Sequence, residues 1–356
     1  MNSMLKAETP AFVTRVAEAV EQQLVSFLDH EQREWGRGDD DLAVAFEEIR
    51  GLVLGGGKRI RPAFCYLGAR AVGGSLTDEV IRAGAALEML HAMALFHDDV
   101  IDGSLTRRGR TTTHVRQSAQ HQSAGWAGDT TRFGQGVAIL VGDLAFVFAD
   151  KLMADMPAIV RDEWTRMRLE VNIGQYLDVV GSARREYTMS AAERIALYKT
   201  AKYTVERPLR LGALIADPSA SDQLLGGLSA YGVALGVAFQ MRDDILGVFG
   251  DPEQTGKPAG DDLRESKPTA LVATALARAD ASQQQALSRV GDPMLDDAAI
   301  GEIRGVIVET GALHDTEARI TELLDSAIVV LDGLNVDDEC REMFRAIGHA
   351  VAWRTV

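Results

Sequence analysis

The stretch His97-Asp98-Asp99-Val100-Ile101-Asp102 ends a long apolar helical pattern, and Gln240-Met241-Arg242-Asp243-Asp244 ends a second one. Carboxylates in such apolar surroundings are costly to desolvate unless a cation compensates them. On a helix, Asp98 and Asp102 share a face, so their charges repel unless something positive lies between them. Oxygen ligands of this kind suit Mg²⁺, which takes one or two carboxylates, several waters and substrate phosphates. The two clusters therefore predict a magnesium site.

Helical periodicity recurs along the chain, whereas the alternating pattern of strands is scarce. Ala, Leu, Glu, Arg and Met are plentiful and Pro numbers only 9, a composition that favours helix. No linker or internal repeat divides the 356 residues, so we expect one all-helical domain over residues 1–356. The expected helices are roughly 11–34, 41–54, 60–73, 78–102, 136–155, 161–182, 190–215, 222–248, 269–290, 295–310, 313–334 and 337–352. The loops 103–135 and 249–268 directly follow the aspartate clusters, as expected for lids over a site.

The net charge of −15 argues against a nucleic-acid partner and disfavours adsorption to an anionic membrane. The cysteines, Cys65 and Cys340, have no CxxC neighbour, so we expect neither a disulfide framework nor a thiolate metal site. Residues 1–10 lack the apolar core of a signal peptide. The most apolar stretch, 137–153, is too short and too charged to span a bilayer and is interpreted as a buried helix. These features predict a cytoplasmic protein without a transmembrane segment.

Basic residues stand close to the aspartate clusters in this acidic chain. Arg107 and Arg108 follow the first cluster, and Lys58, Arg59 and Arg61 follow a triple glycine. Guanidinium groups bind phosphate through two parallel hydrogen bonds, whereas lysine acts as a point charge. We therefore expect diphosphate groups to be held partly by carboxylate-bound Mg²⁺ and partly by direct contacts with these cations.

Several short motifs follow one another along the chain: Gly-Gly-Gly-Lys-Arg-Ile-Arg-Pro at 55–62, Asp-Asp-Val-Ile-Asp at 98–102, Arg-Arg-Gly at 107–109, Gly-Gln-Tyr-Leu-Asp at 174–178, Tyr-Lys-Thr at 198–200, Phe-Gln-Met-Arg-Asp-Asp at 239–244 and Gly-Lys-Pro-Ala-Gly-Asp-Asp-Leu at 256–263. In this order and spacing the chain resembles the trans-isoprenyl diphosphate synthases, or polyprenyl synthetases, over roughly residues 40–350. The resemblance implies an all-helical bundle around a deep central cavity, usually in a homodimer. It also implies 1'-4, head-to-tail, trans condensation of isopentenyl diphosphate with an allylic diphosphate (dimethylallyl, geranyl or farnesyl).

The resemblance implies roles for individual residues as well. Three Mg²⁺ ions would be held on the allylic diphosphate by Asp98, Asp102 and Asp243, within clusters that include Asp99 and Asp244. The side chains expected on that diphosphate are Arg107, Lys199 and Lys257, and Lys267 is a further substrate-binding candidate. The expected isopentenyl diphosphate site is Lys58, Arg61, His91 and Arg108, while Thr200 and Gln240 are expected to face the reacting carbons.

The second cluster departs from the family pattern at one position. The family often carries a third aspartate four residues after the first, where this chain has Gly247. Asp243 and Asp244 remain, and a water or a loop aspartate such as Asp261 could take the place of the third carboxylate.

Two rival functions are weaker interpretations of the same residues. A terpene cyclase also ionises allylic diphosphates, but it usually carries an Asn/Ser/Glu metal triad and would not need Lys58 and Arg61 for a second substrate. A non-catalytic subunit of a heteromeric synthase typically loses aspartates from its clusters, whereas the cluster at 98–102 is complete here. Consumption of isopentenyl diphosphate by the purified protein alone separates both rivals from a synthase.

Product length is expected to depend on the helix that carries Asp98. One helical turn rises about 5.4 Å, close to the reach of one isoprene unit. The residues expected to gauge the product are therefore Met93 and Ala94 at one turn and Leu90 at two. Because Ala94 is small and Met93 is flexible, we expect passage beyond C15 and C20 geranylgeranyl diphosphate as the main product. C15 farnesyl diphosphate is the shorter alternative, and C25 or longer products require that no deeper side chain, such as Phe146 or Phe148, closes the floor.

Overall fold

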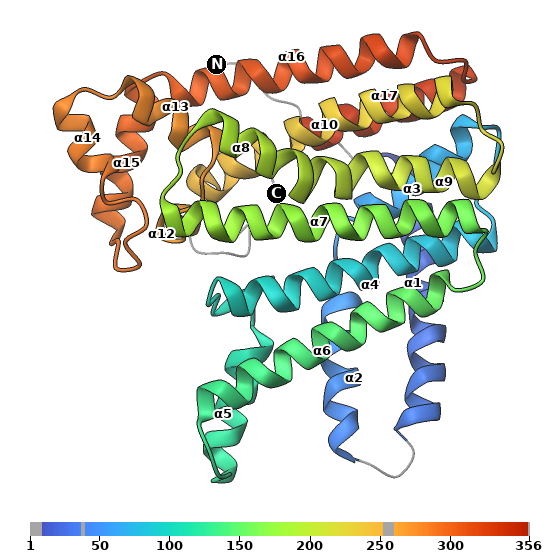
Figure 1. Cartoon of the computed structure of the whole chain (residues 1–356), viewed down its shortest axis with the longest axis horizontal. Helices are drawn as coiled ribbons and strands as arrows, with labels where there is room; N and C mark the ends of the chain where they lie inside the picture. The colour runs from blue at the N-terminus through green and yellow to red at the C-terminus, as the bar shows by residue number, and fades with distance from the viewer. Residues whose placement is uncertain (1–8, 37–39, 252–259, 355–356) are drawn as a thin grey trace.

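The computed structural model describes residues 9–36, 40–251 and 260–354, and these residues are almost entirely helical (Figure 1). The helices are α1 (Ala11–Trp35), α2 (Asp40–Val53), α3 (Ile60–Ala71), α4 (Asp78–Ile101), α5 (Thr113–Ala124), α6 (Thr130–Met153), α7 (Ala158–Arg184), α8 (Met189–Ile195), η1 (Ala196–Glu206), α9 (Arg207–Ala216), α10 (Asp222–Phe249), α12 (Asp261–Arg264), α13 (Ala270–Arg278), α14 (Ala281–Leu287), α15 (Asp297–Glu309), α16 (Ala312–Asp332) and α17 (Asp338–Ala352). A small hairpin of β1 (Thr106–Arg107) and β2 (Arg110–Thr111) follows α4. The prediction of an all-α fold is confirmed.

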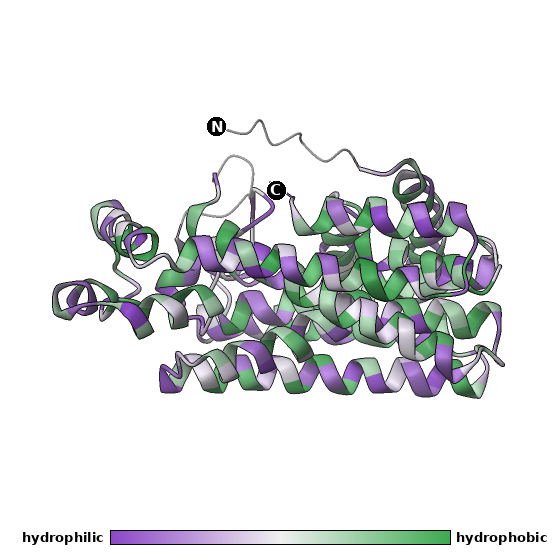
Figure 2. Ribbon diagram, turned by 90° about the horizontal axis from the view of Figure 1, so that it is seen from above, coloured by the Kyte–Doolittle hydropathy of each residue, from purple (hydrophilic) through white to green (hydrophobic). Residues whose placement is uncertain are grey.

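The long helices run side by side in layers, with α7, the α8–η1–α9 segment, α10 and α16 roughly parallel in Figure 1. The closest-packed pairs include α4 with α6, α10 with η1, α10 with α16, and α3 with α9. Green and purple residues alternate along the outer helices in Figure 2, as expected for helices with one buried apolar face. This packing places the ends of α4 and α10, and hence both aspartate clusters, in the same part of the bundle.

The buried apolar residues form a large core and a smaller one. The smaller core is built mainly by α13, α14 and α15, which form the left end of Figure 1. Phe249 and Leu313 pack against both cores. The expectation of a single domain stays a prediction.

Two expected segments differ from the structure. The supposed loop 103–135 contains the β1–β2 hairpin, all of α5 and the start of α6. Helix α5 buries Thr113, His114, Gln117 and His121, so its buried face is polar and shows no hydrophobic periodicity. The expected helix 269–290 is instead two helices, because Asp280 caps a new helix by accepting hydrogen bonds from the backbone of Ser282 and Gln283.

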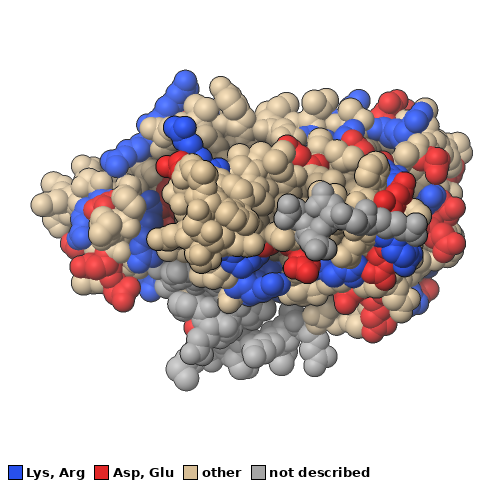
Figure 3. Space-filling view, turned by 90° about the horizontal axis from the view of Figure 1, so that it is seen from below, with Lys and Arg blue, Asp and Glu red and all other residues tan. Residues whose placement is uncertain are grey.

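Among the described residues, α10 is the one helix whose length and apolar composition would allow it to cross a membrane. Half of its most apolar window is buried, and the helix packs against η1 and α16 within the bundle. Its apolar composition therefore matches a core position. The stretch 137–153 lies in α6, which packs along α4 and α5. On the face seen in Figure 3, acidic and basic side chains are interspersed.

Candidate active site

A cavity of about 770 Å³ lies between α3, α4, α7, η1 and α10, and the segment after Gly260 closes one side of it. Most of the expected site residues line it: Lys58, Arg61, His91, Met93, Ala94, Asp98, Arg107, Arg108, Lys199, Thr200, Gln240, Asp243, Asp244 and Lys267. Leu90 is fully buried in the core and is not part of the wall. Lys257 lies outside the described residues.

Asp98 is surrounded by donors from α7, η1 and the hairpin. Its Oδ1 accepts a hydrogen bond from Gln175 Nε2 at 2.8 Å and lies 3.5 Å from Lys199 Nζ. Arg107 Nη2 is 3.8 Å from its Oδ2. Lys199 also donates to Asp178 Oδ2 at 2.5 Å. Burial alone would lower the pKa of Lys199, but Asp98 and Asp178 raise it above the usual value, so this lysine is a cation in the cavity.

Gln175 and Asp178 are functional candidates to which the sequence reasoning assigned no role. Both belong to the Gly-Gln-Tyr-Leu-Asp motif at 174–178 and line the cavity. Their separation of three residues places them on one face of α7, and that spacing is the signal that could have identified them.

Lys267 connects the first aspartate cluster to the segment after α10. Its Nζ lies 3.6 Å from Asp102 Oδ2, 3.5 Å from Asp262 Oδ1 and 2.6 Å from Glu265 Oε2. Burial opposes the charge of Lys267, but these carboxylates raise its pKa well above the usual value. Burial also raises the pKa of Asp102, to about 6, with Asp98 adding to the shift and Lys267 opposing it.

The second cluster connects α10 to η1. Thr200 Oγ1 donates a hydrogen bond to Gln240 Oε1, and Gln240 Nε2 donates to Asp244 Oδ1 at 2.7 Å. Asp244 is buried, and burial raises its pKa well above the usual range. Asp243 instead pairs with Arg354 Nη2 at 2.5 Å. Asp244 thus fixes the amide of Gln240, while Asp243 faces a cation from the C-terminal segment.

The segment η1 that carries Lys199 and Thr200 is a π-helix, a wider helix that is often found at functional sites. It packs against backbone atoms of α7 and α10 at glycines. A Cβ added at Gly174 would lie 2.2 Å from Lys199 N, and one at Gly236 would lie 2.4 Å from Ala201 Cα. Only glycine allows this approach, so these two residues set how deeply η1 reaches into the cavity.

The β1–β2 hairpin sends two consecutive arginines to different places. Arg108 has φ +52° and Gly109 has φ +71°, as in the two-residue type I′ turn. Arg107 donates to Asp99 Oδ1 from Nε at 2.8 Å and from Nη2 at 2.5 Å. Arg108 Nη1 donates to the carbonyls of Leu52 and Gly56. Asp99 is buried and does not line the cavity, so its role in this geometry is to hold Arg107.

The cavity also has a basic side, formed by Lys58, Arg61 and Arg108. Arg61 stacks on Tyr203, with the guanidinium carbon 4.4 Å from the ring centre, and its Nη2 donates to Thr204 Oγ1 at 3.1 Å. Its Nε is buried and has no hydrogen-bond acceptor among the described residues. Arg59, at φ +48°, forms a buried ion pair of 2.5 Å with Glu88 and so fixes the loop that presents Arg61.

His91 and Lys58 have lowered pKa values on this basic side. Burial and the neighbouring Arg61 and Arg108 lower the pKa of His91 well below its usual value, so its imidazole is neutral. Lys58 stands at the rim, where desolvation and the nearby Arg354 lower its pKa to about 8.

The family of the chain follows from comparison with known proteins. A model of the polyprenyl synthetase family matches residues 44–304. The chain belongs to the polyprenyl synthetase family. It is 33% identical over 285 residues to geranylgeranyl diphosphate synthase of Mycobacterium tuberculosis, and the match covers 77% of this chain and 75% of the relative. It is 30% identical over 328 residues to geranylfarnesyl diphosphate synthase of Aeropyrum pernix, which covers 86% of this chain and 95% of the relative.

A solved structure from the polyprenyl synthetase family shares the fold over almost the whole chain. Geranylgeranyl pyrophosphate synthase from Corynebacterium glutamicum, complexed with isoprenyl diphosphate and magnesium, aligns with a TM-score of 0.91 at 39% identity. The match covers 96% of this chain and 99% of that protein.

The acidic side of the cavity has the chemistry of a divalent-cation site. Asp98 and Asp243 line the cavity, whereas Asp102, expected as a metal ligand, does not; all three are hard oxygen donors. Asp102 Oδ2 is buried and accepts no hydrogen bond from the described residues. Lysine and arginine side chains stand against all three carboxylates. A binding site for Mg²⁺ therefore fits this polyprenyl synthetase chain.

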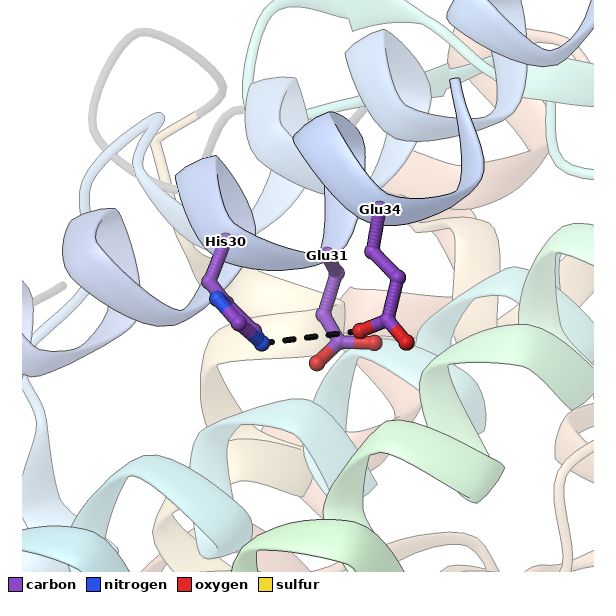
Figure 4. Close-up of side chains that lie close together, drawn as sticks. All are labelled: His30, Glu31 and Glu34. Carbon is purple, nitrogen blue, oxygen red and sulfur yellow. Dashed lines mark ion pairs between the residues drawn. The ribbon is translucent and has the colours of Figure 1, made fainter. Parts of the chain in front are cut away.

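A second group of possible metal ligands lies on α1, away from this cavity (Figure 4). The ligand atoms of His30, Glu31 and Glu34 lie within 4.8 Å of one another. Lys151 Nζ, however, is 2.7 Å from Glu31 Oε1 and 3.8 Å from Glu34 Oε2. The lysine supplies the positive charge there, and the cluster is explained as an ion-pair network between α1 and α6.

Proposed function

We propose that this protein is a prenyl diphosphate synthase that condenses isopentenyl diphosphate with allylic diphosphates and releases mainly C20 geranylgeranyl diphosphate. One observation carries the proposal: a single cavity is lined both by aspartates, Asp98 and Asp243, and by a group of basic side chains around Arg61, with Thr200 and Gln240 in its wall. Two diphosphate substrates need two anion sites, and only one of them needs a metal. Membership in the polyprenyl synthetase family supports the same reaction.

The acidic side is assigned to the allylic diphosphate. Asp98, Asp102 and Asp243 would hold the Mg²⁺ ions, three by family resemblance, and bound Mg²⁺ would stabilise the negative charge on the leaving diphosphate. Lys199 and Arg107 line the same part of the cavity and would contact the diphosphate directly. Lys257 has the same proposed role outside the described residues, and Lys267 would bind substrate from the segment after α10.

The basic side is assigned to isopentenyl diphosphate. Arg61 offers a buried Nε without a hydrogen-bond acceptor, and His91 offers a buried Nδ1 in the same condition among the described residues. Arg108 and Lys58 add positive charge nearby. A bound diphosphate would accept hydrogen bonds from Arg61 Nε and from His91 Nδ1.

The carbon chemistry is assigned to the space beside η1. The allylic C–O bond breaks, the isopentenyl double bond attacks the allylic carbon, and a proton passes to the departed diphosphate. Thr200 Oγ1 and Gln240 Oε1 present oxygen dipoles that would stabilise the allylic cation. Because Thr200 donates to Gln240, which in turn donates to Asp244, the amide oxygen is held in one orientation.

Product length is assigned to the part of the cavity wall formed by the residues of α4 that precede Asp98. Met93 and Ala94 line that wall, and Val171 and Asn172 of α7 also line the cavity. Leu90, which was expected to gauge the product two turns before Asp98, is fully buried in the core and does not line the cavity. Phe148 packs on Phe27 and Phe46 and does not line the cavity. Products of C25 or longer are the second candidate, favoured by the geranylfarnesyl diphosphate synthase relative, and C15 farnesyl diphosphate is the shorter alternative.

We also propose a cytoplasmic homodimer of single-domain subunits. Helices α6 and α7 expose several large apolar side chains at helical spacing. They are Ile139, Leu140, Val147, Leu169, Ile173 and Tyr176. Exposed apolar groups of this kind mark protein interfaces. Both cysteines are buried and free, which suits a reducing compartment.

The experiment that tests the function is an assay with labelled isopentenyl diphosphate. The purified protein receives dimethylallyl, geranyl or farnesyl diphosphate in turn, with Mg²⁺ or with EDTA, and the products are identified by mass spectrometry. We expect C20 diphosphate from each primer in Mg²⁺. Conversion of a primer to a cyclic hydrocarbon without use of isopentenyl diphosphate would replace this function with that of a terpene cyclase.

A further inference from the structure

The helix that carries the second aspartate cluster lacks a carboxylate one turn after Asp243, where Gly247 stands. The space beside Gly247 is nevertheless filled by a carboxylate. A Cβ added at Gly247 would lie 1.8 Å from Asp262 Oδ2 and 2.5 Å from Asp262 Cγ. The side chain of Asp262 therefore occupies the position at which a side chain of residue 247 would begin.

Backbone contacts hold Asp262 at that place. The N–H of Gly260 donates to the carbonyl of Gly247 at 3.2 Å, which fastens the segment after Gly260 to α10. Gly260 has φ +80°, a conformation that favours glycine, and the chain turns there into α12. The N–H of Lys267 donates to the carbonyl of Asp262 at 3.2 Å. The position of Asp262 is thus fixed from both sides of its short helix.

The neighbouring aspartate has a different partner. Asp261 Oδ1 lies 3.1 Å from Arg264 Nη1 in a local pair three residues apart. Asp262 instead lies 3.5 Å from Lys267 Nζ, the same ammonium that lies 3.6 Å from Asp102 of the first cluster. Asp262 therefore shares the ammonium of Lys267 with Asp102 of the first cluster. It also occupies the space beside Gly247, where a side chain of the second cluster would begin.

We propose that Asp262 supplies the active site with the third carboxylate of the second cluster, in place of the side chain missing at Gly247. The assignment rests on the proposed function, because it concerns cation binding in the same cavity. Gly247 leaves the space that Asp262 needs, since any larger residue at position 247 would collide with Asp262. The alternative compensating residue, Asp261, pairs with Arg264, and the carboxylate that meets the Cβ position of Gly247 belongs to Asp262.

The test measures cation binding without turnover. Mn²⁺ is titrated into the purified protein with inorganic pyrophosphate present, and free Mn²⁺ is followed by electron paramagnetic resonance. Asp262→Ala and the isosteric Asp262→Asn should weaken Mn²⁺ binding by about tenfold or more, the range seen when groups around a metal are removed. Asp261→Ala is the matched control and should bind Mn²⁺ like the parent.

A carboxylate exchange makes the test specific. Gly247→Asp alone should also weaken Mn²⁺ binding, because its side chain collides with Asp262 and adds a like charge. The double variant Gly247→Asp/Asp262→Ala returns one carboxylate to α10 and should recover most of the lost affinity. Parent-like binding by Asp262→Asn, or a double variant no better than Asp262→Ala, would overturn the inference. Circular dichroism confirms folding of each variant.

The outcome can be separated from that of the proposed function. A parent protein that binds Mn²⁺ and pyrophosphate but consumes no isopentenyl diphosphate contradicts the synthase and leaves the comparison of variants readable. A parent that condenses isopentenyl diphosphate while Asp262→Asn keeps full Mn²⁺ affinity contradicts only the role of Asp262.

Discussion

The separation of the cavity into two anion sites predicts a crossed pattern of kinetic effects. Arg61→Ala removes a guanidinium whose buried Nε has no hydrogen-bond acceptor in the described structure and whose Nη2 donates to Thr204. A hydrogen bond from a charged group contributes about 1.5–3 kcal/mol, and about 1.4 kcal/mol corresponds to a factor of ten. We therefore expect KM for isopentenyl diphosphate to rise about 10- to 100-fold, while KM for the allylic primer changes less than about twofold.

The matched change on the acidic side is Lys199→Ala, whose ammonium stands between Asp98 and Asp178. This variant should raise KM for the allylic primer and lower kcat, with little change in KM for isopentenyl diphosphate. Arg110→Ala is the control. The Arg110 side chain donates from Nη1 to the carbonyl of Gly51, and Arg110 does not line the cavity. Initial rates are measured with each substrate varied at saturating concentrations of the other. An equal rise in both KM values for Arg61→Ala would refute the assignment of the two sites.

Further predictions concern the metal, the product, the π-helix and acid stability. Asp98→Ala should lower kcat by several orders of magnitude, and activity in EDTA within about tenfold of that in Mg²⁺ would contradict a metal-dependent reaction. Ala94→Phe should shorten the product toward C15 or C10, since Ala94 lines the cavity one turn before Asp98. Product length is measured by mass spectrometry, and an unchanged length at full activity would exclude this path for the tail. Gly174→Ala should lower kcat because its Cβ would meet the backbone of Lys199 at 2.2 Å; parent kinetics would show that the depth of η1 does not matter. The folded-state pKa of His91 is depressed, so its contribution to stability is complete above about pH 6.5 and is lost below it by about 1.4 kcal/mol per pH unit. Urea denaturation from pH 7 to 5 should therefore show a smaller loss of stability for His91→Gln than for the parent.

The fold was largely predictable because most helices show a periodic apolar face. Helix α5 was missed for the opposite reason: its buried face contains Thr113, Gln117 and His121, and hydrophobic periodicity cannot detect it. Its packing depends on Gly134 of α6, where a Cβ would lie 2.2 Å from the carbonyl oxygen of His114. Packing against the next helix, α6, rather than a hydrophobic pattern of its own, stabilises this segment as a helix.

The candidate site was predictable in residue identity more than in geometry. The motifs named most cavity-lining groups, but they could not show that Asp99 turns away from the cavity to hold Arg107. They also could not reveal the π-helix, which packs closely against Gly174 of α7 and Gly236 of α10. For the position left vacant by Gly247, the sequence suggested Asp261, whereas the structure brings Asp262 to it.

The charges of the cavity are balanced before any ligand enters. Asp98 stands against Lys199, Asp102 against Lys267, and Asp243 against Arg354. Asp98 and Asp102 are largely buried, and uncompensated carboxylates there would destabilise the fold, so their pairs explain how the chain can bury them.

The same pairs constrain how substrate and metal can bind. A cation entering alone would have to displace lysine or arginine from each carboxylate and would place its own positive charge beside theirs. A metal diphosphate offers both exchanges together, since the carboxylates can turn to the metal and the basic side chains to the phosphate oxygens. Inorganic pyrophosphate should therefore strengthen Mg²⁺ binding markedly, as measured by calorimetric titration. Equal Mg²⁺ affinity with and without pyrophosphate would show that the basic side chains do not exchange partners when the site fills.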